Sequence, residues 1–377
     1  MQFGECRLKI VPLIGLIAVL VYFSASPAGV DAQFQRQAAA DTPPVRGVPV
    51  QKLIKTLKTT GSPSDFSWSQ DGTFIAMADT INTRITIFDS RTYNPLHVLI
   101  KKVLSYPALV FLPDNKTLAT SGFSLEQSGH PSISLSLIDV ASGSVSRNID
   151  GPFESGLNLA RMLAISQSSP YAATVTQKDQ TGVYLNLYRT DDWSLIKSIP
   201  LHDFIASLAF NPVDGHLAVL TYGRKLQIWE PAQQKMAREL EAFRGSASGE
   251  IAFSIDGFRL ACAHSLALDS PSSVPGSPPG IDLWDARDWH PIVQHSNTAN
   301  AEEQRARSIS FSADGRYLAS LNYDGKVRLW DANSVALIGL IQEHETGGVM
   351  VRFSPSAPDL AITRNWKVDI IRLGPTE

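Results

Sequence analysis

Short apolar runs recur along the chain, each placed between a polar turn and a segment of alternating polar and apolar residues. The clearest unit reads Phe-Ser-Ala-Asp-Gly-Arg-Tyr-Leu-Ala-Ser over residues 311–320 and continues as Val-Arg-Leu-Trp over 327–330. The apolar run at 317–320 predicts a strand near the middle of a sheet, and the alternation over 327–330 predicts a second strand beside it. Asp-Gly at 314–315 supplies the left-handed backbone that a tight hairpin turn requires.

This unit occurs seven times. We define the anchor of each unit as the large apolar residue that opens it; the anchors are Trp68, Phe111, Ile165, Phe210, Phe253, Phe311 and Phe353. Successive anchors lie 42 to 58 residues apart, a period typical of the four-stranded blades of a β-propeller. The widest spacings exceed the others by too little to hold a further blade of about 40 residues. The pattern therefore predicts an all-β, seven-bladed propeller.

Two dipeptides connect these units to a known family. Trp284-Asp285 and Trp330-Asp331, with the hairpin turns ahead of them, resemble the WD40 repeat. The resemblance covers about residues 50–373, and it implies a ring in which the first strand of the chain completes the last blade. Residues 50–57 form a solitary strand pattern before the first anchor, so we expect the N-terminal strand to close the ring and remove its open sheet edges.

The chain also departs from the WD40 pattern. The Gly-His dipeptide that usually precedes each repeat is absent, although His202 and His344 occupy similar places. The Asp that usually stands six residues before the Trp is present only as Asp324. These departures predict an incomplete structural hydrogen-bond network and a divergent, bacterial-type propeller. TolB-like and YncE-like periplasmic propellers are the neighbouring alternatives within the same architecture.

The N-terminus has the order of a secretory signal peptide over residues 1–32. Arg7 and Lys9 precede an uncharged apolar stretch, and Val-Asp-Ala at 30–32 fits the small-x-Ala cleavage preference. We expect cleavage before Gln33 and a location outside the cytoplasm, either periplasmic or extracellular. The alternative is an uncleaved membrane anchor, because the stretch without charged residues is about as long as a membrane span.

The predicted domain organisation follows from these segments. The signal peptide at 1–32 is followed by a Gln-, Ala- and Pro-rich segment at 33–49, whose composition is typical of a flexible spacer. The propeller occupies 50–377. After cleavage we expect no stable insertion into a membrane.

Charge and cysteine content exclude several function classes. The chain has 33 Lys and Arg against 36 Asp and Glu, a net charge of −3, which argues against general electrostatic binding of nucleic acid. Its two cysteines are Cys6, within the predicted signal peptide, and Cys262. A disulfide framework or thiolate metal site is therefore not expected. Cys262 lies in an apolar run, which predicts a small buried residue rather than a nucleophile.

Candidate catalytic and metal-binding residues are few. His290 and His295, near Glu302 and Glu303, could be proposed as metal ligands, but this spacing in a loop arises readily by chance. Asp-Asp at 191–192 is interpreted as a hairpin cap. We therefore predict no catalytic, cofactor-binding or metal-binding residue and no cofactor; the sequence favours a protein that is not an enzyme.

The long connections predict where a partner binds. In the WD40 arrangement, the loops between second and third strands and the connections between blades lie on one face, here named the loop face; the opposite face is the turn face. The long segments assigned to the loop face are 122–132, 146–162, 264–280 and 291–306, and the short, similar turns assigned to the turn face are 89–92, 285–288 and 331–334. Insertions gathered on one face of a repeat ring usually mark the binding face.

The sequence thus predicts an exported, noncatalytic scaffold that binds a protein partner, or an envelope complex, through its loop face, with no role in binding nucleic acid. The alternative is an extracytoplasmic propeller enzyme or redox subunit with its site at the mouth of the central channel. Propeller enzymes assemble their sites from several blades, so no local motif distinguishes the two hypotheses.

Overall fold

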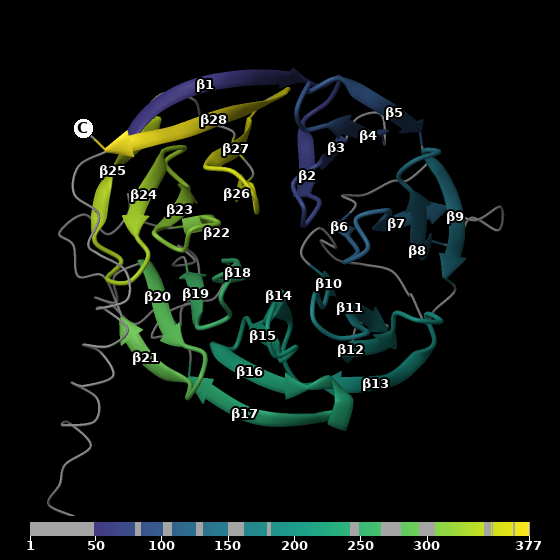
Figure 1. Cartoon of the computed structure of the whole chain (residues 1–377). Coiled ribbons are helices and arrows are strands. Elements are labelled where there is room, and N and C mark those ends of the chain that lie inside the picture. The colour runs from purple at the N-terminus through teal and green to yellow at the C-terminus, as the bar shows by residue number, and fades with distance from the viewer. Residues whose placement is uncertain are drawn as a thin grey trace, which may run out of the picture. The chain divides into compact units, whose positions relative to one another are not determined.

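The computed structural model describes residues 49–79, 84–100, 108–125, 131–149, 162–178, 182–241, 249–264, 280–293, 306–342, 348, 350–364 and 366–376. These residues form seven four-stranded antiparallel sheets. Figure 1 shows the sheets arranged as the blades of a ring, with one strand of each blade near the axis and one at the rim. The predicted seven-bladed, all-β propeller is confirmed.

Each blade is described from the strand nearest the axis to the strand at the rim. This is also the order along the chain, except that β1 is the outer strand of blade 7. Blade 1 contains β2 (Pro63–Trp68), β3 (Phe74–Asp79), β4 (Arg84–Asp89) and β5 (Pro95–Ile100). Blade 2 contains β6 (Leu109–Phe111), β7 (Thr117–Leu125), β8 (Pro131–Asp139) and β9 (Ser144–Ile149). Blade 3 contains β10 (Leu163–Ile165), β11 (Tyr171–Lys178), β12 (Gly182–Arg189) and β13 (Leu195–Leu201). Blade 4 contains β14 (Ile205–Phe210), β15 (Leu217–Thr221), β16 (Lys225–Glu230) and β17 (Lys235–Glu241), with a short 3-10 helix at Pro231–Gln233.

The remaining blades follow the same order. Blade 5 contains β18 (Ile251–Phe253), β19 (Arg259–His264), β20 (Gly280–Asp285) and β21 (His290–Val293). Blade 6 contains β22 (Ala306–Phe311), β23 (Tyr317–Asn322), β24 (Val327–Asp331) and β25 (Leu337–Gln342). Blade 7 contains β26 (Val351–Phe353), β27 (Asp359–Arg364), β28 (Lys367–Thr376) and the N-terminal strand β1 (Pro49–Lys58).

Strand β1 closes the ring as predicted. It pairs antiparallel with β28 from Pro49 opposite Thr376 to Lys58 opposite Lys367. In Figure 1 the two strands lie side by side at the rim, the first in purple and the last in yellow. The two ends of the propeller domain therefore share one sheet, in which β1 covers the outer edge of β28.

Each anchor is the last residue of the innermost strand in its blade, so the seven-fold repeat was assigned in the correct register. The turns after the anchors also agree with the prediction, because Gly72, Gly215, Gly257 and Gly315 all have positive φ angles. The turns between third and fourth strands are short and alike. In six blades the fourth residue after the third strand has a positive φ; these residues are Tyr93, Gly143, Trp193, Gln234, Trp289 and Val335.

The hydrophobic core is divided among the spaces between blades. Seven clusters of buried side chains fill these spaces, one for each pair of neighbouring sheets in the described part of the ring. Trp284 is 3 % exposed and Trp330 is 2 % exposed, so both are packing residues. Cys262 is fully buried, and burial raises the pKa of its thiol well above the ordinary value, as expected for an unreactive core residue.

The structure corrects the bounds of several predicted loops. Residues 122–125 and 131–132 belong to strands β7 and β8, which pair as far as Leu125 opposite Pro131. Residues 146–149 and 291–293 belong to β9 and β21. These segments contain Ser, Gly and Pro among apolar residues, so their strand pattern is weak in the sequence. The end residues 264, 280 and 306 of the predicted loops also belong to strands (β19, β20 and β22), and residue 49 of the predicted spacer begins β1. Apart from residue 162, the rest of the four loops lies outside the described residues, as do the predicted signal peptide, residues 33–48 of the spacer, His295, Glu302 and Glu303. Within the described ranges, no helix is long and apolar enough to span a membrane.

Candidate functional site

Each innermost strand borders the axis of the ring (Figure 1), and its successive side chains point to opposite faces of the blade. The residue one before each anchor is small or aliphatic in six blades and is Arg352 in the seventh; the six are Ser67, Val110, Ala164, Ala209, Ala252 and Ser310. The wall of the central channel is therefore mostly uncharged at this level, and Arg352 of β26 is the exception.

The residue three before the anchor connects neighbouring blades. Four of these residues accept a hydrogen bond from a backbone N–H in the first strand of the next blade. The bonds run from Leu109 N to Asp65 Oδ2 (2.6 Å), Ile251 N to Ser207 Oγ (3.2 Å), Ile309 N to Glu250 Oε2 (3.3 Å) and Val351 N to Ser308 Oγ (3.2 Å). Two of the four acceptors are buried carboxylates, so the channel wall holds negative charge next to Arg352.

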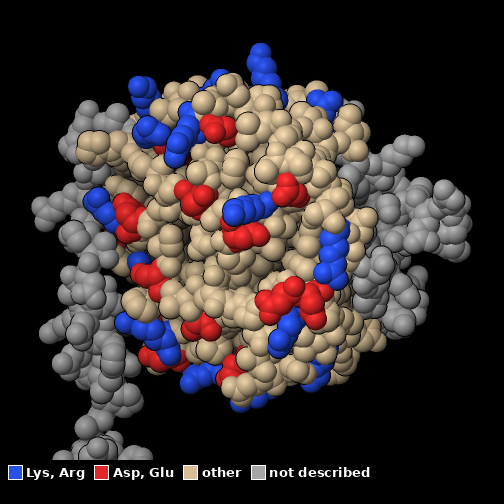
Figure 2. Space-filling view, turned by 45° about the vertical axis from the view of Figure 1, so that its right-hand side comes forward, with Lys and Arg blue, Asp and Glu red and all other residues tan. Residues whose placement is uncertain are grey.

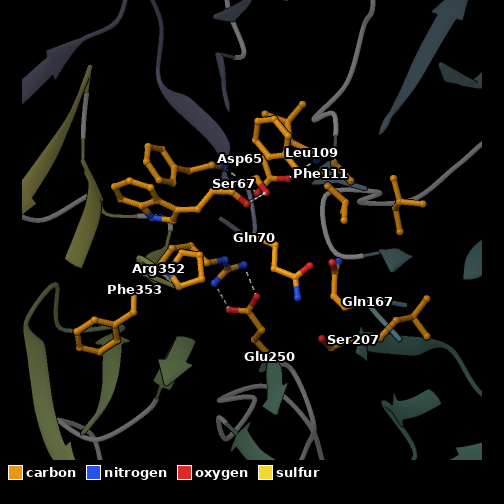
Figure 3. Close-up of a pocket in the computed structure, with 17 residues that line it drawn as sticks. Asp65, Ser67, Gln70, Leu109, Phe111, Gln167, Ser207, Glu250, Arg352 and Phe353 are labelled. Carbon is orange, nitrogen blue, oxygen red and sulfur yellow. Dashed lines mark hydrogen bonds and ion pairs between the residues drawn. The ribbon is translucent and has the colours of Figure 1, made fainter. Parts of the chain in front are cut away.

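Arg352, Glu250 and Ser308 form a polar cluster across three blades, and Figure 3 shows the Arg352–Glu250 pair within it. Arg352 donates through Nη1 to Glu250 Oε2 (3.0 Å) and to Ser308 Oγ (3.1 Å), and through Nη2 to Glu250 Oε1. The Ser308 hydroxyl donates to Glu250 Oε2 (2.7 Å). Burial alone would lower the pKa of the Arg352 guanidinium, but the charge and hydrogen bonds of Glu250 outweigh burial and raise it. This ion pair joins blade 7 to blade 5.

Asp65 is the second carboxylate in the channel. It is 5 % exposed, and its two oxygens accept hydrogen bonds from Phe66 N (2.9 Å) and Leu109 N (2.6 Å). Burial raises the pKa of Asp65 to about 7, against the opposing effects of Arg352 and the two backbone N–H groups. Its charge therefore changes near neutral pH, unlike that of an ordinary aspartate.

Asp65, Glu250 and Arg352 line a cavity of about 340 Å³ in the channel. Gln70 and Gln167, each two residues after an anchor, also line it, and Figure 3 shows both side chains pointing into its centre. Gln167 Oε1 and the indole nitrogen of Trp68 are buried and have no hydrogen-bond partner among the described residues. Both atoms are enclosed by their surroundings, so neither is presented to the open space of the cavity.

The loop face presents most of the exposed aromatic side chains. Five described aromatic residues are exposed: Phe204, Tyr222, Phe258, Tyr323 and Trp366. Tyr222, Tyr323 and Trp366 lie in connections between second and third strands, and Phe204 precedes β14, so four of the five are on the loop face. Phe204 and Tyr222 are neighbours, since Tyr222 N donates to Phe204 O (2.8 Å).

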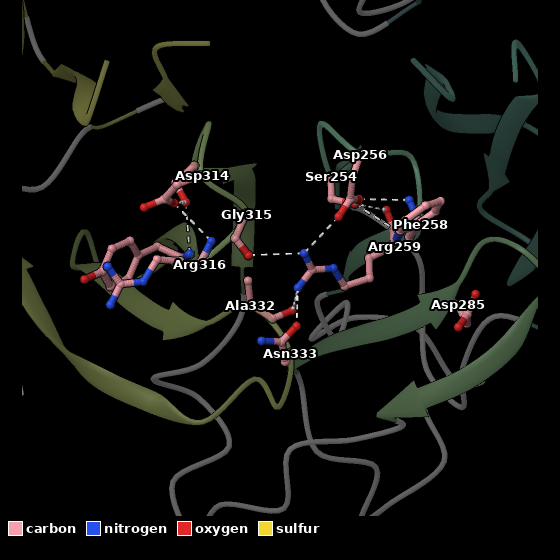
Figure 4. Close-up of polar contacts among 12 residues, drawn as sticks. Ser254, Asp256, Phe258, Arg259, Asp285, Asp314, Gly315, Arg316, Ala332 and Asn333 are labelled. Atoms are coloured by element: carbon pink, nitrogen blue, oxygen red, sulfur yellow. Dashed lines mark hydrogen bonds and ion pairs between the residues drawn. The ribbon is translucent and has the colours of Figure 1, made fainter. Parts of the chain in front are cut away.

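The turn face is held together by side-chain and backbone hydrogen bonds. Arg259, 8 % exposed, donates from blade 5 to Gly315 O (3.2 Å), to Ala332 O (3.2 Å) and to Asn333 Oδ1, all in blade 6 (Figure 4). The predicted cap at 191–192 is present, because Asp192 Oδ1 accepts from the backbone N–H of Ser194 (2.9 Å). These contacts are structural links between and within blades.

Surface charges of both signs are mixed. Figure 2 shows Lys and Arg interspersed with Asp and Glu over the side that it presents, and several of them form pairs, such as Lys225 with Glu239 and Glu241. His290 is exposed at the start of β21. Within the described ranges, no group of three or more His, Cys, Asp or Glu could hold a metal ion.

The hydrogen-bond network expected from the WD40 pattern is changed in this chain. In blade 6, Trp330 Nε1 donates to Ser320 Oγ (2.8 Å), whose hydroxyl donates to Asn322 Oδ1 (2.6 Å). Asp324 instead pairs with Arg328 (2.7 Å). Counting from the anchors, Cys262 of blade 5 occupies the position of Ser320, and Trp284 Nε1 has no partner among the described residues.

The channel residues are not among those predicted from the sequence. Asp65, Glu250 and Arg352 stand three or one residue before an anchor, so an alignment of the seven repeats shows charged side chains in the innermost strands. Their convergence depends on ring closure, which brings blade 7 beside blade 1, and no local motif reports it.

Comparisons with known proteins agree with the fold. Residues 295–331 match the family model "WD domain, G-beta repeat". The structure is similar to the β-propeller domain of Cps50 (Swd1) from Myceliophteria thermophila, with a TM-score of 0.66 and 13 % sequence identity, covering 86 % of this chain and all of that domain. No curated protein shows significant sequence similarity to the chain. One repeat of the chain is therefore similar to the WD40 family model, and the whole ring is similar in fold to a known β-propeller domain.

Proposed function

We propose that this protein is a noncatalytic WD40 propeller that binds a protein partner through its loop face. The WD40 propeller fold commonly acts as a protein-interaction scaffold. The observation that carries the proposal is the position of the exposed aromatic residues, four of five on the loop face. Aromatic side chains are enriched at protein interfaces and contribute a large part of the binding energy there.

The acids of the channel have roles that fit a scaffold better than a catalytic centre. Asp65 and Glu250 both accept hydrogen bonds from the backbone of the next blade, and Glu250 is paired with Arg352. A general acid or base must instead reach a proton of the substrate. The geometry therefore favours a protein-binding scaffold over the alternative of a propeller enzyme with its site in the channel.

Substitutions on the two faces test the binding surface. A triple variant, Tyr222→Ser, Tyr323→Ser and Trp366→Ser, removes exposed aromatic rings from the loop face, and Phe258→Ser removes the exposed ring of the turn face. We expect both variants to melt like the parent protein. Partners crosslinked to the parent and identified by mass spectrometry should be lost from the triple variant and retained by Phe258→Ser. The reverse result would place the binding surface on the turn face.

We also propose that the protein acts outside the cytoplasm, in the periplasm or beyond, within an envelope complex. The proposal rests on the basic, apolar and small-residue order of residues 1–32. Expression of the full chain in a bacterial host, followed by fractionation and N-terminal sequencing, tests it. A chain that begins at Gln33 in the soluble extracytoplasmic fraction is the expected result. A chain that retains Met1 and sediments with membranes would show that the segment is an anchor.

A further inference from the structure

Three large apolar side chains are exposed on the turns that join first to second strands in blades 4 and 5. Val213 is 58 % exposed, Ile255 is 47 % exposed and Phe258 is 48 % exposed; together they are named the turn-face patch. The equivalent turns of the other five blades all lie within the described residues, and they contain no exposed aliphatic or aromatic residue other than proline. The turn therefore does not need these side chains for its own conformation, and a partner that covers them removes apolar surface from water.

The two turns lie against each other and are fixed by hydrogen bonds. Asn211 Nδ2 donates to Gly257 O in the next blade (2.9 Å), and Asn211 Oδ1 accepts from Val213 N (2.9 Å). Gly257 lies against Val213, since a β-carbon at residue 257 would stand 2.9 Å from Val213 Cγ2. Asp256 Oδ1 accepts from Phe258 N (2.9 Å), and Figure 4 shows both residues in the blade 5 turn. The patch is therefore continuous across two blades and rigid, so little conformational entropy is lost when a partner covers it.

The turn face around the patch is acidic. Its turns, taken as the residues between first and second strands and between third and fourth strands, all lie within the described residues. They contain eight Asp and four Lys or Arg, although the whole chain has 36 acidic and 33 basic residues. In blades 3 to 5 the Asp, Lys and Arg residues of these turns are Asp191, Asp192, Asp214, Asp256, Asp288 and Arg287.

The one cation among these turns is already engaged. Arg287 pairs with Asp285 (2.5 Å) and lies over the Phe258 ring, 5.1 Å from its centroid. Hydrogen bonds from the Ser194 hydroxyl and backbone N–H lower the pKa of Asp192, which keeps this carboxylate ionised at neutral pH. The border of the patch is therefore negative, and it complements a partner with positive charge.

We propose that the turn-face patch binds a basic segment of a partner protein, in which apolar side chains alternate with Lys or Arg. The apolar side chains of this segment cover Val213, Ile255 and Phe258, and its cations lie among the aspartates of blades 3 to 5. Charge complementarity selects a basic partner and disfavours an acidic one. The patch is on the face opposite the aromatic residues of the loop face, so the inference does not rest on the function proposed above.

Fluorescence anisotropy with the full chain and three short labelled peptides tests this inference. The first peptide alternates Lys with Leu, the second has Ser in place of Leu, and the third has Glu in place of Lys. We expect the Lys–Leu peptide to bind most tightly, because it alone supplies both the charge and the apolar surface. Its affinity should fall as ionic strength rises, because exposed charges are screened by salt.

Two variants remove the two components of the surface separately. The double variant Val213→Ser, Ile255→Ser should weaken binding of the Lys–Leu peptide about tenfold or more. The triple variant Asp191→Asn, Asp192→Asn, Asp214→Asn should weaken it about threefold or more at low ionic strength and reduce its salt dependence. Asparagine keeps the side-chain oxygen that accepts from the backbone in these turns, as Asp192 does from Ser194 N and Asp214 from His216 N. Both variants should therefore melt like the parent.

Matched substitutions away from the turn face provide the controls. Leu96→Ser with Val98→Ser removes two exposed apolar side chains of the outer strand β5, and this variant should bind the Lys–Leu peptide like the parent. The loop-face triple variant described above should also bind it like the parent.

The proposal is overturned if the Lys–Leu peptide does not bind, or binds equally to the parent and to the Val213→Ser, Ile255→Ser variant. Equal binding of the Lys–Ser peptide would mean that charge alone attracts the probe, and equal binding of the Glu–Leu peptide would mean that charge does not select it; either result also overturns the proposal. Loss of binding in the loop-face triple variant would move the site to the other face. None of these outcomes depends on the crosslinking experiment that tests the loop face.

Discussion

Asp65 shows how one buried residue makes the stability of the ring depend on pH. Its pKa is about 7 in the folded protein, against an ordinary value of 3.8, because it is buried. Between these values the folded state holds a proton that the unfolded state has lost. The free energy of unfolding therefore falls as pH rises from about 4 to 7. Above pH 7 Asp65 is ionised in both the folded and the unfolded state, so its titration no longer changes the free energy of unfolding.

The substitution Asp65→Asn should remove this pH dependence. Relative to the variant, the parent should lose about 2–3 kcal/mol of unfolding free energy between pH 5 and pH 8, measured by urea denaturation. We expect the variant to be less stable at every pH, because its amide has only one acceptor oxygen for the two backbone N–H groups; the slope is therefore the readout. Glu241→Gln is the control, since the Glu241 side chain is 87 % exposed. Parallel curves for parent and Asp65→Asn would contradict the assignment.

Burial could be predicted at single residues better than hydrogen bonding. The place of Trp284 and Trp330 at the end of an alternating strand predicts buried packing residues, and both are buried. The same pattern does not show that only Trp330 has a hydroxyl partner. The partner is set by a residue on the neighbouring strand, which is Ser320 in blade 6 and Cys262 in blade 5. The hydrogen bond can therefore be predicted only once it is known which residues of the two strands lie side by side.

Among the elements, β1 is the one whose removal should affect the whole ring. It covers the edge of β28, and Leu57 at its C-terminal end is 3 % exposed in the cluster between blades 7 and 1. Deleting residues 49–57 exposes the edge of β28 and opens this cluster. We expect the cooperative thermal transition to be lost or lowered by more than about 10 °C, as a change of several kcal/mol requires in a domain of this size.

A point substitution and a peptide complete the test of ring closure. Leu53 on the same strand is 58 % exposed, so Leu53→Ser should leave the melting temperature within about 2 °C of the parent. A synthetic peptide of residues 49–58 should restore part of the lost stability of the deletion variant. If the deletion variant melts like the parent, then β1 does not hold the ring closed in solution.

The elements differ in how far the sequence predicts them. Strand identity and order followed from the anchors, because the same buried alternation recurs in every blade. The ends of β7 and β8 did not, because residues 122–125 and 131–134 alternate small polar residues with apolar ones. Such a segment reads equally well as a loop, and its strand conformation depends on pairing between the two sides of a hairpin.

At the scale of the whole molecule, the blades cooperate through the channel as well as through the core between sheets. Glu250 and Arg352 belong to blades that are not neighbours, and Ser308 of blade 6 lies between them. Removing the cation should leave a mostly buried carboxylate without its charge partner. For Arg352→Met we expect a loss of about 2–4 kcal/mol, at the lower end of values for buried pairs because a quarter of the Arg352 side chain is exposed.

The double variant Glu250→Gln, Arg352→Met distinguishes a local from a ring-wide effect. Once the carboxylate is neutral, loss of the cation should cost less, so the double variant should be more stable than Arg352→Met alone, with a coupling of at least about 1 kcal/mol. Urea denaturation followed by fluorescence and by circular dichroism should give one shared transition in every variant, because each blade packs on two others. Separate transitions in the two signals would mean that blades 5 to 7 unfold apart from the rest, and that the channel cluster stabilises those blades rather than the closed ring.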